Sequence, residues 1–175
     1  DLIVQRTRDG YNWEGEVNLG RSFQTSDKTS LAVFNNTLYL AFTDTSERVM
    51  YASAVEDTTS VAGVRFNTPI QVSGNGQSQA SQHGPSLIEY QDKLYVFFIS
   101  TEDNQEIIYS TSDTGNSGSW SAKKNLFANF NQSSDHRVST TVLNDTLYVA
   151  FTGNGNTSLN VAYSSNGTSW FSNVA

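Results

Sequence analysis

The sequence Leu38-Tyr39-Leu40-Ala41-Phe42 returns twice with small changes, as Leu94-Tyr95-Val96-Phe97-Phe98 and as Leu147-Tyr148-Val149-Ala150-Phe151. The second copy starts 56 residues after the first, and the third starts 53 residues after the second. Each copy is too short for a typical helix and is apolar on both faces, which is typical of a β strand covered on both sides. The pattern therefore predicts a repeat whose second strand lies between neighbouring sheets.

Matching elements surround each copy of this strand. A preceding strand is predicted over Ser30–Phe34, Ser86–Tyr90 and Ser139–Leu143. The turns between the two strands are Asn35-Asn36, Gln91-Asp92 and Asn144-Asp145. Short hairpins require a positive φ, which Asn and Asp tolerate. A third strand is expected to end near a tyrosine, at Tyr51, Tyr109 and Tyr163. A fourth carries an aromatic residue, at Trp13, Phe66, Trp120 and Trp170, with spacings of 53, 54 and 50 residues.

Composition narrows the class of protein. The chain has 175 residues, a net charge of −7 and no cysteine. Nucleic-acid surfaces need clustered Lys and Arg, so a nucleic-acid partner is not expected. Disulfides and thiolate metal sites are excluded because there is no cysteine. No apolar run has the length of a membrane span, and no calcium-loop motif is present, so we predict no membrane insertion, no metal and no cofactor.

The turn between the third and fourth strands carries the most specific pattern. It is Thr7-Arg8-Asp9-Gly10-Tyr11-Asn12-Trp13 in the first copy and Ser164-Ser165-Asn166-Gly167-Thr168-Ser169-Trp170 in the last, with a looser copy from Ser112 to Trp120. These turns resemble the Asp-box turns of sialidase-type and related lectin β-propellers, Ser-x-Asp-x-Gly-x-x-Trp. In that family the turn is structural, and the resemblance implies an all-β propeller of four-stranded blades. The repeat here is about 53 residues long, and the chain holds about 3.5 copies.

We expect one domain, 1–175, with blade-like units over 1–23 (partial), 30–72, 85–127 and 139–175. Known propellers use roughly four to eight blades, so about three and a half units do not close a ring. Open strand edges seek partners, which predicts a homo-oligomer or a complex with another segment. The chain starts at Asp1 and not Met, so we expect a processed or excised product that is secreted or extracellular.

A second repeated motif lies in the linkers between units. It reads Gln24-Thr25-Ser26-Asp27-Lys28, Gln79-Ala80-Ser81-Gln82-His83 and Gln132-Ser133-Ser134-Asp135-His136. Amide, carboxylate and cationic groups together suit a polyhydroxylated ligand, because each sugar hydroxyl both donates and accepts. The candidate ligand-binding residues are Gln24, Asp27, Lys28, Gln79, Gln82, His83, Gln132, Asp135 and His136. In the alternative interpretation these side chains only satisfy the loop backbone.

The favoured function is that of a lectin, with repeated, multivalent sites for glycans at the blade junctions. Sialidases of the family use three arginines, a Tyr–Glu pair and an Asp. This sequence lacks the family's Arg-Ile-Pro element, and its six arginines match no family context, so we assign no catalytic residues. Two alternatives stay open: a fragment of a sialidase-like glycoside hydrolase, and a non-catalytic protein-binding propeller. His83 and His136 are expected on neighbouring blades, too far apart to share an ion.

Overall fold

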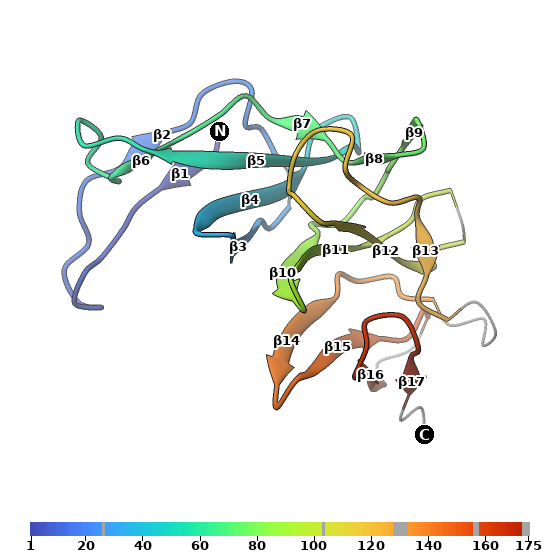
Figure 1. Cartoon of the computed structure of the whole chain (residues 1–175). Coiled ribbons are helices and arrows are strands. Elements are labelled where there is room, and N and C mark those ends of the chain that lie inside the picture. The colour runs from blue at the N-terminus through green and yellow to red at the C-terminus, as the bar shows by residue number, and fades with distance from the viewer. Residues whose placement is uncertain (26, 103, 128–132, 156–157, 173–175) are drawn as a thin grey trace.

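The computed structural model describes residues 1–25, 27–102, 104–127, 133–155 and 158–172 (Figure 1). The regular secondary structure within these ranges consists of β strands alone. No helix there is long and apolar enough to cross a membrane. All strand pairings are antiparallel, which confirms the expected all-β class. The strands form three large sheets in chain order and two small hairpins.

Sheets A, B and C are the three large sheets. Sheet A contains β3 (Ser30–Phe34), β4 (Thr37–Thr43), β5 (Val49–Glu56) and β6 (Val64–Phe66), with β7 (Ile70–Gln71) also paired to β5. Sheet B contains β10 (Ser86–Tyr90), β11 (Lys93–Ile99), β12 (Ile107–Ser112) and β13 (Lys124–Asn125). Sheet C contains β14 (Ser139–Leu143), β15 (Thr146–Thr152), β16 (Leu159–Ser164) and β17 (Phe171–Ser172).

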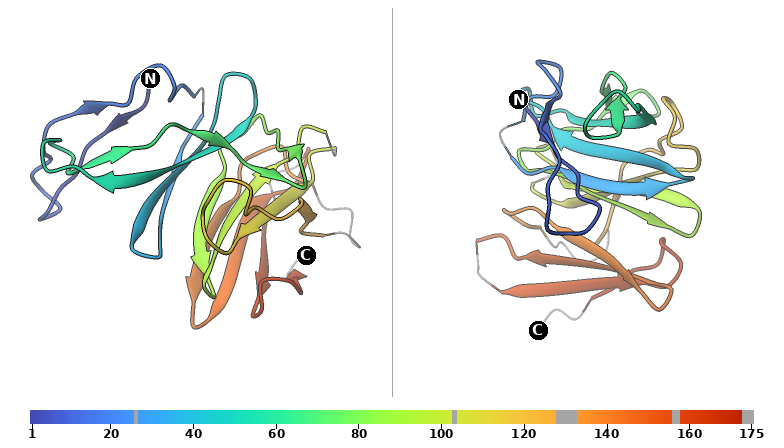
Figure 2. Two further views of the ribbon diagram at one scale, coloured as in Figure 1. Left: turned by 45° about the horizontal axis from the view of Figure 1, so that its top comes forward. Right: turned by 90° about the vertical axis from the view of Figure 1, so that its left-hand side faces the viewer.

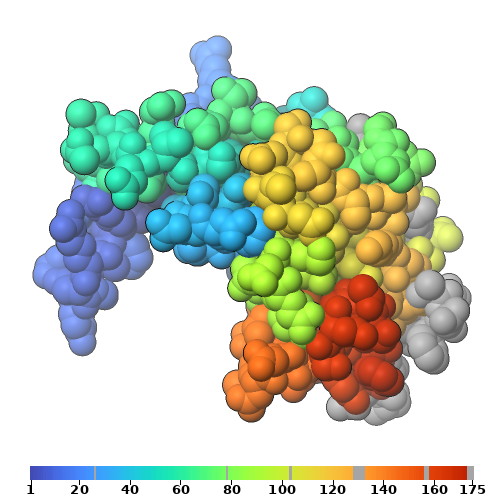
Figure 3. Space-filling view, viewed as in Figure 1, coloured from blue at the N-terminus to red at the C-terminus, as the bar shows by residue number. Residues whose placement is uncertain are grey.

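Two hairpins complete the set of strands. The N-terminal hairpin pairs β1 (Ile3–Val4) with β2 (Val17–Asn18), and a second hairpin pairs β8 (Ser73–Gly74) with β9 (Gln77–Ser78). Sheets A, B and C follow one another along an arc, with the N-terminal hairpin beside sheet A (Figure 2). The N-terminal hairpin lies at one end of the arc and sheet C at the other, so the arc does not close into a ring (Figure 3). This arrangement is propeller-like.

The turns between first and second strands have the predicted backbone. Both residues of each turn have positive φ, in the order 47° and 58° for Asn35-Asn36, 49° and 57° for Gln91-Asp92, and 49° and 54° for Asn144-Asp145. Two-residue hairpins of this kind match the right-handed twist of their strands. The prediction for these turns is therefore confirmed.

The turns between third and fourth strands are closed by a side chain. Oδ1 of Asp9 accepts hydrogen bonds from the backbone N–H groups two and three residues further on, at 2.9 and 2.8 Å. Oδ1 of Asn166 makes the equivalent pair of bonds at 2.9 and 2.8 Å. The next residue, Gly10 or Gly167, has a φ of 79° or 69°, a backbone conformation that glycine adopts without strain. These turns thus share one geometry.

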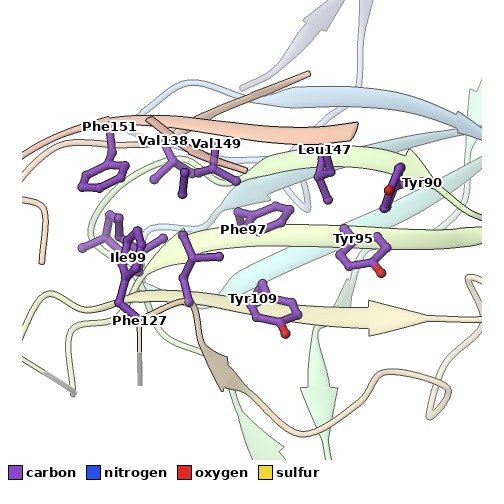
Figure 4. Close-up of a cluster of buried hydrophobic side chains, with 13 residues drawn as sticks. Tyr90, Tyr95, Phe97, Ile99, Tyr109, Phe127, Val138, Leu147, Val149 and Phe151 are labelled. Atoms are coloured by element: carbon purple, nitrogen blue, oxygen red, sulfur yellow. The ribbon is translucent and has the colours of Figure 1, made fainter. Parts of the chain in front are cut away.

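Strand β11 is buried on both faces, as predicted for the second strand of the repeat. Residues Leu94 to Ile99 are each at most 2% exposed. One face packs on sheet A, and the other face packs on Leu147, Val149 and Phe151 of sheet C (Figure 4). Strand β15 alternates between buried and half-buried residues, because only its sheet B side is covered. Hydrophobic packing between successive sheets therefore holds the arc together.

Each junction between sheets also pairs a tryptophan with a tyrosine of the preceding sheet. Trp120 meets Tyr51 edge-on at 5.2 Å, and Trp170 meets Tyr109 at 5.7 Å between ring centroids. The sequence placed Tyr163 in the same series as these tyrosines, and that alignment is wrong. Tyr51 and Tyr109 lie opposite Ala41 and Phe97, whereas Val161 lies opposite Ala150, the equivalent of Phe97.

Candidate ligand site at the linker edge

The linkers between units gather at one edge of the sheets. We call the residues 24–25, 27–28, 79–83 and 133–136 the linker edge. The loops that lead into β5 and β12 pair with them: Arg48 forms a bridge with Ala80, and Glu106 forms one with Ser133. The hairpin turns described above lie at the other ends of the same strands, the turn edge. The linker motif is therefore collected on one side of the arc.

A hydroxyl group shapes each linker in the same way. Thr25 Oγ1 accepts a hydrogen bond from the N–H of Asp27 at 3.1 Å and donates to its carbonyl oxygen at 3.1 Å. Ser81 makes the same two bonds to the backbone of His83, at 3.2 and 2.9 Å. Ser134 repeats them on His136, at 3.2 and 2.6 Å. Asp27, His83 and His136 are therefore structurally equivalent.

This equivalence corrects the alignment of the linker motif by one residue. The sequence comparison placed Asp27 with Gln82 and Asp135, because it aligned Ser26 with the serines of the other copies. The number of residues between the linker motif and the following strand gives the correct alignment. Asp27, His83 and His136 each precede the first residue of that strand by three positions, at Ser30, Ser86 and Ser139.

The three equivalent side chains form a row across the units. Nδ1 of His83 lies 3.7 Å from Oδ2 of Asp27, and the ring of His83 stacks on that of His136 with 6.4 Å between centroids and 10° between planes. The expectation that the two histidines lie far apart is wrong, because the linkers converge at this edge. Among the described residues, no group of three or more His, Asp or Glu side chains is placed to hold a metal ion.

Asp27 connects all three sheets. Its carboxylate accepts hydrogen bonds from the N–H groups of Lys28 at 2.6 Å and Gly84 at 2.9 Å, and from the Arg137 guanidinium at 3.3 Å. Burial opposes ionisation of Asp27, but the two backbone bonds and the nearby charges of Arg137 and His83 outweigh it and lower the pKa of the carboxyl group. Asp27 is therefore an anion that fixes the guanidinium at the edge.

Replacing Asp27 with asparagine should lower thermal stability in a pH-dependent way. A carboxyl group whose pKa is lower in the folded than in the unfolded state stabilises the fold above its unfolded pKa of about 4 and stops doing so as pH falls through the folded value. The difference in unfolding midpoint between wild type and Asp27→Asn should thus be largest at pH 7 and shrink below pH 4. Equal differences at pH 7 and pH 3 in thermal melts would contradict this account.

Two adjoining cavities open beside the row. The larger, about 450 Å³, is lined by His83, His136, Arg137, Val138, Ser139, Ala150, Phe151, Thr152 and Leu159. The smaller, about 150 Å³, is lined by Gln82, His83, Ile99, Ser100, Thr101 and Gln105. The ring of His83 borders both. Ligand pockets are commonly 300–1,000 Å³ with apolar walls and a few polar groups, and the larger cavity has this character.

The candidate residues Gln24, Lys28, Gln79, Gln82 and Gln132 are not members of the row. Gln79 is 1% exposed, so a ligand at the surface cannot reach its side chain. Gln24 donates to Asp1 at 3.2 Å, and Gln82 donates to Glu47 at 3.3 Å. Lys28 is exposed, and Gln132 lies outside the described residues.

Asp135 and Arg137 flank the row on the sheet C side. The hydrogen bond between His136 and Asp135, at 2.6 Å, is the main reason that the pKa of Asp135 is lowered, and a bond from the N–H of Gly155 adds to it. The sequence analysis missed Arg137, although it follows His136 directly. A histidine and an arginine side by side at the start of a strand were the available signal.

The architecture defines a coarse class, a β-propeller-like protein. Solved structures of similar fold include a Trypanosoma rangeli sialidase in complex with sialic acid, at 14% identity and a TM-score of 0.59 over 98% of this chain and 32% of that chain. The same sialidase with the inhibitor DANA gives 15% identity and a TM-score of 0.54 over the same shares, 98% and 32%. The Bombyx mori GH32 β-fructofuranosidase BmSUC1 gives 8% and 0.56, over 83% and 34%.

These likenesses concern the fold alone, because the identities are low. Both kinds of neighbour are propeller glycoside hydrolases, and this chain spans about a third of their length. No protein-family profile matches the sequence, and no curated protein matches it.

Proposed function

We propose that this chain is a carbohydrate-binding, lectin-like β-propeller segment whose ligand site is the larger cavity of the linker edge. One observation carries the proposal. Imidazole and guanidinium groups of His83, His136 and Arg137 share a 450 Å³ cavity with the apolar side chains of Val138 and Phe151. A sugar has hydroxyl groups at its rim and C–H groups on its face, so it needs polar and apolar contacts together.

The fold neighbours support the sugar class of this proposal. They include a sialidase solved with sialic acid and a β-fructofuranosidase, and the names of both proteins refer to sugars. The proposal includes the assignment of the turns of Asp9 and Asn166 to the Asp-box type and a secreted or extracellular location. The two cavities adjoin at His83, so they are proposed as subsites of one edge, and multivalency then comes from further copies of the chain.

A segment of a glycoside hydrolase is the second candidate, favoured by the fold neighbours and by the third of their length that this chain spans. Glycoside hydrolysis usually needs one carboxylic acid whose pKa is raised, so that it can protonate the leaving group. The carboxyl groups of Asp27, in the row, and of Asp135, beside it, both have lowered pKa values. They are suited to hold cations and hydroxyl groups in place and unsuited to act as a general acid.

Glycan binding and hydrolysis separate the two candidates. On a glycan array the chain should bind selected sugars, and calorimetry with a hit should show affinity reduced at least about 10-fold by Arg137→Ala or His136→Ala, equivalent to 1.4 kcal/mol for one strong contact. Arg8→Ala is the matched control, since Arg8 is exposed on the opposite turn edge. Unchanged affinity in both cavity variants would refute the site. Hydrolysis of fluorogenic sialosides or fructosides would favour the enzyme.

A further inference from the structure

Among the described residues, none covers one face of sheet C at the end of the arc. On this face Tyr148, Val161 and Tyr163 are half-buried, while Leu159 and Phe171 are 74% and 56% exposed. The equivalents of Tyr148, Leu159 and Val161 in sheet B are Tyr95, Ile107 and Tyr109, which are at most 3% exposed because sheet C covers them. The open face of sheet C is thus the first half of a junction that occurs elsewhere in the chain.

The N-terminal hairpin presents part of the other half, namely the third strand and the tryptophan of a unit. Trp13 bridges Thr7 across its turn, as Trp120 bridges Ser112, so the two tryptophans are equivalent. Trp120 is 4% exposed because it packs on the preceding sheet, whereas Trp13 is 62% exposed.

Ile3 of strand β1 also has a counterpart in sheet B, Ile108. It precedes Thr7 by four residues, as Ile108 precedes Ser112. Ile108 is 2% exposed within the cluster between sheets A and B, and Ile3 is 55% exposed. Ile3 and Trp13 therefore lack the preceding sheet that their counterparts contact.

We propose that the open face of sheet C binds the N-terminal hairpin of a second copy of this chain, head to tail. Trp13 and Ile3 of one copy then pack on the face formed by Tyr148, Val161 and Tyr163 of the next. The second copy is the occupant that the structure favours, because the two uncovered faces carry counterparts of residues that meet at the junctions between sheets A and B and between sheets B and C. Such an interface is heterologous, so it generates rings or open chains.

The charge of the chain sets the salt dependence. Each copy carries a net charge of −7, so copies repel one another at low ionic strength. The contact itself is apolar, and added salt screens the repulsion. Association should therefore strengthen between 20 and 300 mM NaCl, which is the opposite of a contact held by salt bridges.

Two single variants, each defective at one face, provide the decisive experiment. Light scattering of the 175-residue chain should give a multiple of 19.2 kDa, and Trp13→Ser or Phe171→Ser should each weaken self-association at least 10-fold. Mixing the two variants should restore a 1:1 pair, since each keeps the face that the other lacks. Tyr11→Ser is the matched control, because Tyr11 is 88% exposed on the same hairpin and should leave association unchanged. Circular dichroism checks that each variant is folded.

Two outcomes overturn the proposal. A wild-type chain that stays at 19.2 kDa up to millimolar concentration would mean that another sequence covers both faces. Variants that lose association but fail to pair when mixed would rule out the head-to-tail geometry. Glycan binding by the Trp13→Ser variant is a separate measurement, so failure of the interface and failure of the ligand site can be told apart.

Discussion

Replacing Gly84 with alanine is expected to lower the unfolding midpoint of the chain by about 2–12 °C. A Cβ atom at this position would lie 2.0 Å from the carbonyl oxygen of Lys28, so the backbone itself must move. Forced overpacking costs about 1–3 kcal/mol, occasionally more, and each kcal/mol shifts the midpoint by about 2–4 °C for a chain of this size. The N–H of Gly84 also binds Asp27, so the same variant should weaken glycan binding. Differential scanning calorimetry measures the first effect.

Gly15→Ala is the matched control for this variant. An added Cβ at Gly15 would meet Val61 at 3.5 Å, an ordinary contact, and φ there is not positive. Its midpoint should stay the same or rise slightly, because alanine reduces the entropy of the unfolded chain. If Gly84→Ala melted together with Gly15→Ala, the close approach of Lys28 and Gly84 would not exist in solution.

Replacing Phe97 with alanine should lower the free energy of unfolding by about 3–5 kcal/mol, the usual loss for a fully buried phenylalanine. Phe97 is 0% exposed and lies between sheets B and C (Figure 4). Its ring is 5.6 Å from Tyr109 and 5.8 Å from Trp170 between centroids. Truncation would leave a cavity at the centre of this junction, which urea titration followed by tryptophan fluorescence would report.

Phe97→Leu gives the graded control. Leucine keeps most of the volume, so the loss should stay below about 1.5 kcal/mol. The variant Tyr11→Ala should cost less than about 0.5 kcal/mol, because Tyr11 is 88% exposed. Equal losses for Phe97→Ala and Phe97→Leu would show that the site collapses around the smaller side chain and that sheets B and C are not tightly packed.

Local repeats explain why much of the fold could be predicted from the sequence. The unbroken apolar run of the second strand, as in Leu94–Phe98, predicts that the strand is buried. The residue types of the turn Asn35-Asn36 predict its positive φ. Both properties are set by neighbouring residues along the chain. The Asx-type geometry at Asp9 could be predicted for the same reason.

The site was harder to predict, because its geometry depends on how the units converge. A shift of one residue in the linker comes from Thr25, which makes the backbone bonds that serines make in the other copies. Sequence spacing along the chain says nothing of the 6.4 Å between His83 and His136, since that distance depends on the angle between sheets. The same holds for Arg137, which reaches Asp27 two units earlier.

The linker edge and the turn edge differ in which segments their backbone hydrogen bonds connect. At the linker edge, backbone bonds cross from one segment to another, as from Ser134 to Gln105 at 2.9 Å and from Thr101 to Ala80 at 3.3 Å. At the turn edge, bonds such as Ser119 to Asn116 stay within one hairpin. Some turns also contact the next sheet through a side chain, as Gln91 does by donating to the carbonyl oxygen of Ser165. At an exposed turn position such as Asn116 an insertion disturbs mainly its own hairpin, whereas one extra residue in a linker displaces the whole row of side chains. Peptides for display or labelling are best inserted beside Asn116, where added length leaves the ligand edge intact.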